Sequence, residues 1–154
     1  MKFPQTFLLI ALSACLPAVA PAQINSDELA ATVAAVKAVR AHYAAGPTSL
    51  VMPQRDELAR EVGRRIGAKP LLVTSAYTCE LGPRPGTRTC RLREPATNLY
   101  LGNGRVSDGQ WFFVINVHRP GPGSDDPMST EMHIVRVKKI NGAWVATVEP
   151  GPLV

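Results

Sequence analysis

Cysteine is the residue type with the clearest chemistry in this sequence. The chain contains three cysteines, and ten residues separate Cys79 from Cys90. Neither belongs to a CxxC motif, and no third or fourth soft ligand lies nearby, which argues against redox catalysis and against a zinc site. We therefore expect a Cys79–Cys90 disulfide, which closes a short loop and contributes roughly 2–3 kcal/mol to stability. Such a bond in turn predicts an oxidising compartment.

Arginines gather around this predicted disulfide. The segment between the two cysteines contains Gly82-Pro83-Arg84-Pro85-Gly86, and its prolines and glycines predict a tight turn. Guanidinium groups bind carboxylates or phosphates with two hydrogen bonds, and a disulfide-closed loop loses little entropy on binding. We expect a partner-binding surface here, made of Arg84, Arg88, Arg91 and Arg93. An alternative remains open, in which the disulfide only stabilises a short hairpin and the arginines keep it soluble.

Two histidines are weaker candidates. His118 ends an aromatic strand pattern and His133 opens the next one, with Asp125, Asp126 and Glu131 in or near the connecting loop. If the strands are neighbours and the imidazoles are close, this group could bind a metal or perform acid–base chemistry. However, no HExxH or similarly spaced pair is present, and the sequence has no nucleophile elbow or phosphate-binding glycine loop. We therefore expect no metal, no cofactor and no catalytic residue.

The first 22 residues are typical of a secretory signal peptide. Residues 7–16 form an apolar run that is too short to span a bilayer, and Ala20-Pro21-Ala22 places small residues before a cleavage site at Gln23. Within the same segment, Leu12-Ser13-Ala14-Cys15 resembles the lipobox of bacterial lipoproteins, which makes Cys15 a candidate lipidation site and leaves a membrane anchor as the alternative. Either route predicts export, to the periplasm or beyond, and a single domain over residues 23–154.

The charge of the chain narrows the choice of partner. The formal net charge is +5 and the isoelectric point is near 9.4, with acidic and basic residues interspersed. Export separates the protein from nucleic acid, and no helix shows a basic face interleaved with aromatic residues, so we expect no nucleic-acid binding. A basic exported protein is suited to an acidic protein surface.

Two helices are expected before the strands begin. Asn25 and Glu28 fit a capping box at the start of the first helix, which Gly46-Pro47 ends. The second is expected to begin around Pro53 and to end at Gly67, and its apolar stripe consists of Leu58, Val62 and Ile66.

Beyond Pro70 the apolar period changes from 3.6 to 2. This pattern predicts strands over residues 71–79, 88–93, 98–101 and 110–117. Asn141-Gly142 is typical of a type I′ hairpin turn, which sets the register of the last two strands. We expect the cross-strand pairs Ile140 with Ala143, Lys139 with Trp144, Val137 with Ala146, and Val135 with Val148.

Together these elements predict an α+β domain. Two N-terminal helices would pack on one face of a curved antiparallel sheet of five or six strands. This order is similar in outline to cystatin-like and nuclear-transport-factor-like sheets. The likeness is architectural and implies no site residue.

The expected function follows from predicted export, from the positive net charge and from the loop closed by the predicted Cys79–Cys90 disulfide. Our main hypothesis is an exported periplasmic, non-enzymatic binding protein for a protein partner with an acidic surface, with an inhibitor or immunity protein as its narrower form. Two alternatives remain open. One is a membrane-tethered lipoprotein subunit of an envelope assembly, and the other is a small enzyme that uses His118 and His133.

Overall fold

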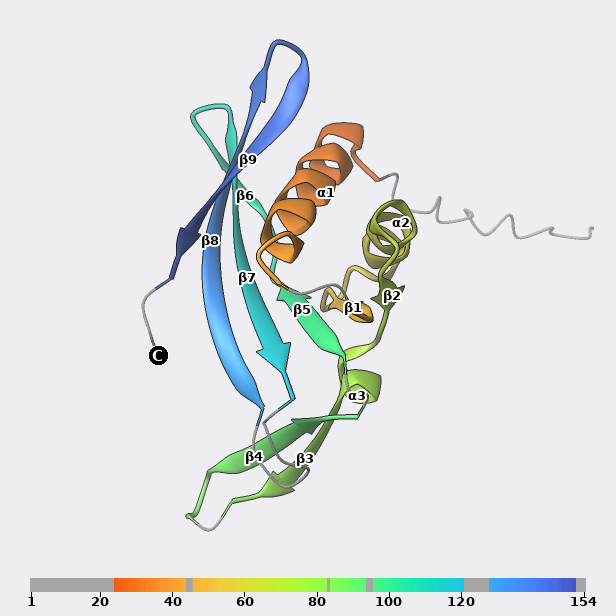
Figure 1. Ribbon diagram of the computed structural model, residues 1–154, viewed down its shortest axis with the longest axis vertical. Coiled ribbons are helices and arrows are strands. Elements are labelled where there is room, and N and C mark those ends of the chain that lie inside the picture. Colours follow the sequence, from red (N-terminus) through yellow and green to blue (C-terminus); the bar gives the residue numbers. More distant parts are fainter. Residues whose placement is uncertain (1–23, 44–45, 83, 94–95, 121–127, 152–154) are drawn as a thin grey trace, which may run out of the picture.

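A mixed sheet, covered on one face by two long helices, makes up most of the protein (Figure 1). The computed structural model describes residues 24–43, 46–82, 84–93, 96–120 and 128–151. The predicted signal segment, Cys15 and the Asp125-Asp126 pair lie outside these residues. Helices packed against a mainly antiparallel sheet confirm the predicted α+β class.

Both predicted long helices are present, but the first ends at Arg40, earlier than the end predicted at Gly46-Pro47. Helix α1 spans Ser26–Arg40, and the Asn25 side chain accepts hydrogen bonds from the backbone of its first turn. Helix α2 spans Asp56–Ile66, three residues after the expected start at Pro53. It ends, as predicted, at Gly67, whose φ of 68° lies in the left-handed region that glycine adopts without strain.

The sheet has the strand order β2-β1-β5-β7-β8-β9, and β6 pairs with β7. Strand β1 is parallel to both of its neighbours, and the remaining pairs are antiparallel. The strands are β1 Thr48–Val51, β2 Lys69–Pro70, β5 Thr97–Leu101, β6 Arg105–Ser107, β7 Gln110–Arg119, β8 Ser129–Ile140 and β9 Ala143–Pro150.

The last hairpin confirms the register read from the sequence. Asn141 and Gly142 both have positive φ, as a type I′ turn requires, and all four predicted cross-strand pairs are present. The Lys139 ammonium lies 5.4 Å from the centre of the Trp144 ring. Val135 and Val137 are fully buried, while the opposite face of β8 and β9 is more exposed.

The core lies between this sheet and the helices. Phe113, Ile115 and Val117 alternate along β7 and point toward α1 and α2, because successive residues of a strand face opposite sides. From α2, the stripe predicted at Leu58, Val62 and Ile66 completes the layer, and each of these side chains is buried. Residues of β7 at even positions, including His118, therefore face away from the two helices.

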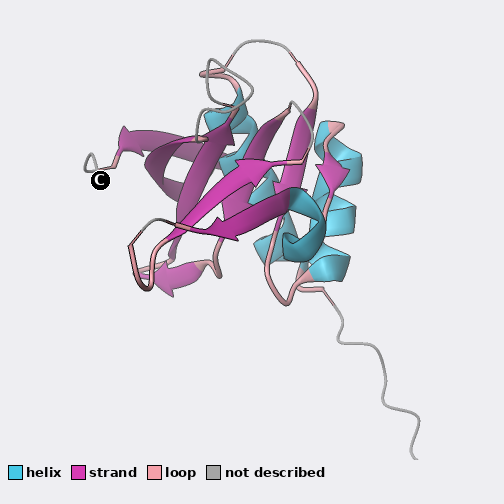
Figure 2. Ribbon diagram, turned by 90° about the horizontal axis from the view of Figure 1, so that it is seen from below, coloured by secondary structure: helices cyan, strands magenta, loops and turns pink. Residues whose placement is uncertain are grey.

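A small second sheet accounts for the remaining strands. The one-turn helix α3, Val73–Ala76, leads into β3, Tyr77–Leu81, which pairs with β4, Arg88–Leu92. This hairpin extends past one end of the main sheet (Figure 1), and a view from below places it with α3 at the near end of the molecule (Figure 2).

Candidate functional site

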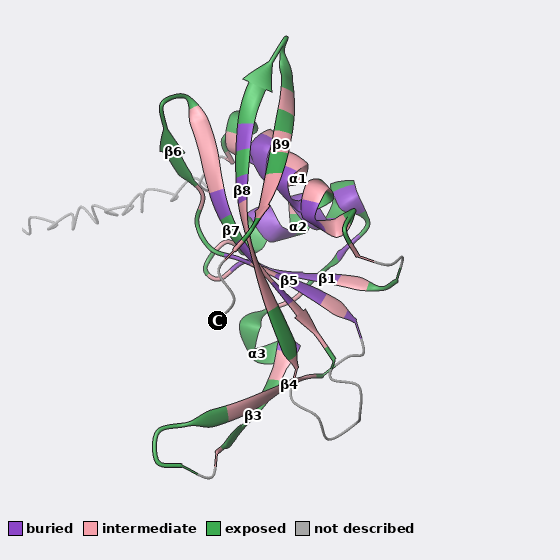
Figure 3. Ribbon diagram, turned by 60° about the vertical axis from the view of Figure 1, so that its left-hand side comes forward, coloured by how far each residue is buried: buried purple, intermediate pink, exposed green. Residues whose placement is uncertain are grey.

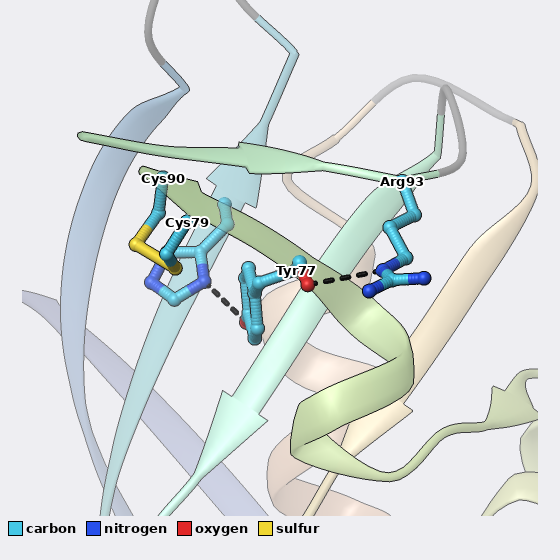
Figure 4. Close-up of a disulfide and its surroundings, with 5 residues drawn as sticks. Tyr77, Cys79, Cys90 and Arg93 are labelled. Atoms are coloured by element: carbon cyan, nitrogen blue, oxygen red, sulfur yellow. Dashed lines mark hydrogen bonds between the residues drawn. A yellow bond between two sulfur atoms is a disulfide. The ribbon is translucent and has the colours of Figure 1, made fainter. Parts of the chain in front are cut away.

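The β3–β4 hairpin contains the predicted disulfide. Cys79 and Cys90 are bonded, and they are directly opposite each other in the hairpin, with their Cα atoms 4.1 Å apart. Directly opposed residues point to the same side, so Tyr77, Leu81 and Arg88 share the face that carries the disulfide. Figure 4 shows Tyr77 beside the two bonded cysteines. The disulfide prediction is confirmed, and the bond is consistent with an oxidising compartment.

The four candidate arginines do not form one patch. Arg84 lies in the exposed turn, and Arg88 is exposed on the disulfide face. Arg91 alternates to the opposite face, beside Glu80 and Thr78. Arg93 follows the strand, and its Nε donates a hydrogen bond to the Tyr77 carbonyl at 3.1 Å (Figure 4). Arg84 in the turn and Arg88 on the disulfide face are therefore the exposed arginines at the tip of the hairpin.

Leu81 is the most exposed large apolar residue that the structure describes. Its side chain has 84 % of its surface in solvent, although it lies two residues from the disulfide and directly opposite Arg88. Thr78, Cys79 and Glu80 on the same strand are also exposed, whereas most of β4 is half-buried (Figure 3). The tip thus combines an exposed leucine with two arginines.

A small hydrogen-bond cluster attaches the base of the hairpin to the main sheet. The Tyr77 hydroxyl lies 3.1 Å from Asn98 Oδ1 and 2.6 Å from His118 Nδ1, and Asn98 and His118 are opposite each other on β5 and β7. An amide oxygen can only accept, so the hydroxyl donates its one hydrogen to Asn98 Oδ1 and accepts a hydrogen bond from the Nδ1–H of His118. Burial raises the pKa of Tyr77 and lowers the pKa of His118. Both groups are therefore held in their neutral forms at neutral pH.

A second polar cluster lies on the helix side of the sheet. Tyr43, just beyond α1, donates to Glu131 at 2.8 Å and also contacts His133 Nε2, while Arg119 pairs with Glu131 and lies over the Tyr43 ring. Because the hydroxyl hydrogen goes to Glu131, His133 donates its Nε2 hydrogen to Tyr43. Burial, and then the bond to Glu131, raise the pKa of Tyr43, and burial lowers the pKa of His133.

Two nitrogen atoms of this cluster are enclosed by the surrounding residues. His133 Nδ1 and Arg119 Nε are buried and have no hydrogen-bond partner among the described residues. The unshared electron pair of His133 is thus enclosed, and the Tyr43 hydroxyl is already engaged on both sides. These contacts connect the end of the first helix to strands β7 and β8.

The structure does not bring His118 and His133 together. Strands β7 and β8 are neighbours, but the register pairs Ile115 with His133 and His118 with Thr130. Since side chains alternate along a strand, the two imidazoles point to opposite faces of the sheet. A joint site built on both therefore does not fit their placement. Within the described ranges, no three His, Cys, Asp or Glu side chains are arranged to hold a metal ion.

Four residues of these clusters were not identified from sequence as contributors to a site: Tyr43, Tyr77, Asn98 and Arg119. For Tyr77, the strand pattern in the sequence does indicate this role. Alternation from Cys79 places Tyr77 on the disulfide face, so an anchoring tyrosine at the base of the hairpin follows from the strand pattern. The contacts of Tyr43 and Asn98 depend on the packing of distant segments, which leaves no local signal.

Comparison with known proteins identifies no relative. No protein-family model, no curated protein and no solved structure matches this chain. In the part of the chain that the structure describes, no helix is long and apolar enough to cross a membrane.

Proposed function

We propose that this protein is an exported, non-enzymatic binding protein that contacts an acidic protein partner through the tip of its β3–β4 hairpin. The observation that supports this most strongly is Leu81, with 84 % of its surface in solvent beside two exposed arginines. A leucine in that position stabilises the isolated fold very little. Its burial against a partner would contribute about 2 kcal/mol to binding.

The construction of the hairpin supports the same function. The Cys79–Cys90 bond lies between the tip and the base, and Tyr77 bonds the base to the main sheet. A tip held at both points loses little conformational freedom when it binds, so more of the contact energy appears as affinity. Arg84 and Arg88 supply forked donors that match carboxylates.

The interaction is proposed to take place outside the cytoplasm, after export of the protein. The signal-like N-terminus and the disulfide both favour an extracytoplasmic location. There, an acidic hydrolase or toxin of the cell envelope is a fitting partner, and inhibitor or immunity protein is the narrower form of the proposal. A lipid anchor at Cys15 would change where the domain is held and leave the hairpin surface the same.

Site-specific photo-crosslinking tests the proposal in the cells that produce the protein. A photo-reactive phenylalanine derivative replaces Leu81 in one strain and Val145 in a second. Val145 is a matched control because it is also exposed, at 42 %, but lies on β9. We expect one discrete protein adduct from position 81 and none of that mass from position 145. The absence of an adduct from position 81, or the same adducts from both positions, would overturn the proposal.

A further inference from the structure

We propose that the hairpin binds its partner by strand addition, in which an extended acidic segment of the partner pairs with the free edge of β3. This inference rests on the proposed function and specifies how the contact is made. It follows from the direction of backbone groups in β3, the exposure of that edge and the charge around it.

The register of the hairpin determines which backbone groups point outward. In an antiparallel pair, opposed residues alternate between hydrogen-bonded pairs, with Cα atoms about 5.5 Å apart, and non-hydrogen-bonded pairs, at about 4.5 Å. The 4.1 Å between Cys79 and Cys90 identifies a non-hydrogen-bonded pair. The N–H and C=O groups of Cys79, and of Leu81 two residues later, therefore point away from β4.

Two backbone hydrogen bonds confirm this alternation from either end of the hairpin. The Gly82 N–H donates to the Thr87 carbonyl at 2.9 Å, and the Arg93 N–H donates to the Ala76 carbonyl at 3.0 Å. Counting in steps of two from these bonds makes Thr78 and Glu80 the residues that bond to β4. Cys79 and Leu81 are then the residues available to an added strand.

The outer edge of β3 is open over a defined length. Residues 78–81 are all exposed, and within the described part of the chain the small sheet consists of β3 and β4 alone. The backbone groups available for pairing do not extend back to the Tyr77 carbonyl, because that carbonyl already accepts a hydrogen bond from the Arg93 side chain. A partner strand is thus directed to Cys79 and Leu81, next to the tip. Such pairing supplies affinity through main-chain hydrogen bonds, while the flanking side chains supply specificity.

Charge determines the kind of strand that fits. Residues 77–93 contain four arginines and one glutamate. On the disulfide face, Leu81 would contact an apolar side chain of the added strand, and Arg88 is long enough to reach an acidic one past Leu81. The β8–β9 hairpin, which forms the other long edge, contains three cations and two glutamates over residues 129–150, and Arg136 there pairs with Glu149, so its net charge is less positive than that of residues 77–93. An acidic strand is therefore favoured at β3 over β9.

Amide hydrogen exchange and chemical shifts of the full-length domain test this inference. The probe is the blocked peptide acetyl-Glu-Thr-Val-Thr-Glu-Thr-amide at millimolar concentration, which places one valine between two glutamates on the same face of an added strand. The same peptide with lysine in place of glutamate is its control. We expect the acidic probe to shift and protect the amides of Cys79 and Leu81. The β9 amides that point outward, those of Trp144, Ala146 and Val148, should not respond. No response at Cys79 and Leu81, an equal response to the lysine peptide, or a response at β9 instead would overturn strand addition.

Two variants separate the main-chain contact from the side-chain contact. Leu81→Ala removes the apolar side chain and keeps the N–H, whereas Leu81→Pro removes both. Proline is tolerated here because the lost N–H points outward and forms no bond within the hairpin. We expect Leu81→Pro to bind the probe at least tenfold more weakly than Leu81→Ala, while equal affinities would contradict strand addition. If crosslinking from position 81 persists while the probe has no effect, strand addition fails and the proposed function stands.

Discussion

The Tyr77 hydroxyl lies 2.6 Å from His118 Nδ1, which connects the first residue of β3 to the end of β7. The same hydroxyl lies 3.1 Å from Asn98 Oδ1, and the Asn98 side chain is almost completely buried. The β3–β4 hairpin is therefore attached to the main sheet by side-chain hydrogen bonds. The half-buried Tyr77 sets the direction of the hairpin relative to the main sheet, and the disulfide sets the geometry of its two strands.

Removal of that hydroxyl should destabilise the protein measurably. Tyr77→Phe leaves Asn98 Oδ1 and His118 Nδ1 without the bond, and unsatisfied buried groups cost about 1–3 kcal/mol. We expect the free energy of unfolding in urea to fall by about 1–2 kcal/mol. Tyr100→Phe is the control, because the Tyr100 ring also packs near His118, at 6.0 Å between ring centres. An equal loss in both variants would show that the Tyr77 hydroxyl has no special role.

Loss of the disulfide should loosen the hairpin more than the core. In Cys79→Ser, Cys90→Ser, the ring-closure contribution of roughly 2–3 kcal/mol disappears. We expect amide exchange at Thr78 and Glu80 to accelerate by about 30- to 150-fold, the same free energy expressed as a rate ratio. Exchange at Ile115, in the centre of the main sheet, should change far less. Uniform acceleration over both sheets would mean that the hairpin does not open on its own.

Mild acid should destabilise the folded protein through two half-buried histidines, His118 and His133. Burial lowers the folded-state pKa of His118 and of His133 below the ordinary value of 6.5. Below pH 6.5 the unfolded chain therefore binds more protons than the folded one, and the stability present above pH 6.5 is lost as the pH falls toward the folded-state pKa. Urea unfolding at pH 7.5 and 5.5 should show the lower stability at pH 5.5. A smaller pH effect is expected for His118→Gln, His133→Gln, and greater stability of the wild type at pH 5.5 would contradict this account.

The mature N-terminus should distinguish a free protein from a tethered one. The small residues before Gln23 predict cleavage at that position. Mass spectrometry of protein purified from its natural host should therefore give a chain that starts at Gln23 and carries no lipid. A chain that starts at a lipid-modified Cys15 would instead establish the membrane-tethered alternative.

Local signals were sufficient to predict part of the fold. The Asn141-Gly142 turn and the alternation around it predicted the β8–β9 register, because a two-residue turn leaves only one pairing that buries Val135 and Val137. Asn25 and Gly67 similarly marked helix ends through their own backbone chemistry.

Long-range pairing could not be predicted in the same way. Strand β1, Thr48–Val51, was not expected, since its short apolar run shows no alternation: Ser49, Leu50 and Val51 are all buried. Its pairing with β5 and β2 makes the sheet mixed, where a wholly antiparallel one was predicted. The strand expected over residues 71–79 begins only at Tyr77, because Val73–Ala76 forms a helical turn despite its β-branched residues.

The candidate site likewise contains features that nearby residues predict and features that depend on long-range packing. The disulfide and the arginine-bearing turn follow from residue types close in sequence, and the disulfide is confirmed. The bonds from Tyr77 to Asn98 and His118 join three strands, so their geometry exists only once the sheets have packed. Likewise, the separation of His118 from His133 depends on a strand register that neither residue reveals.

A charge-reversal comparison tests the central claim most directly. Arg84→Glu, Arg88→Glu changes the tip of the hairpin, and Arg105→Glu, Lys138→Glu makes the same change in net charge at exposed positions on the main sheet. Each variant is used to capture the partner that crosslinks at position 81, and the amount recovered is measured against wild type. We predict at least a tenfold loss for the hairpin variant and near-wild-type recovery for the sheet variant. Equal recovery by both variants would contradict the hairpin as the binding surface.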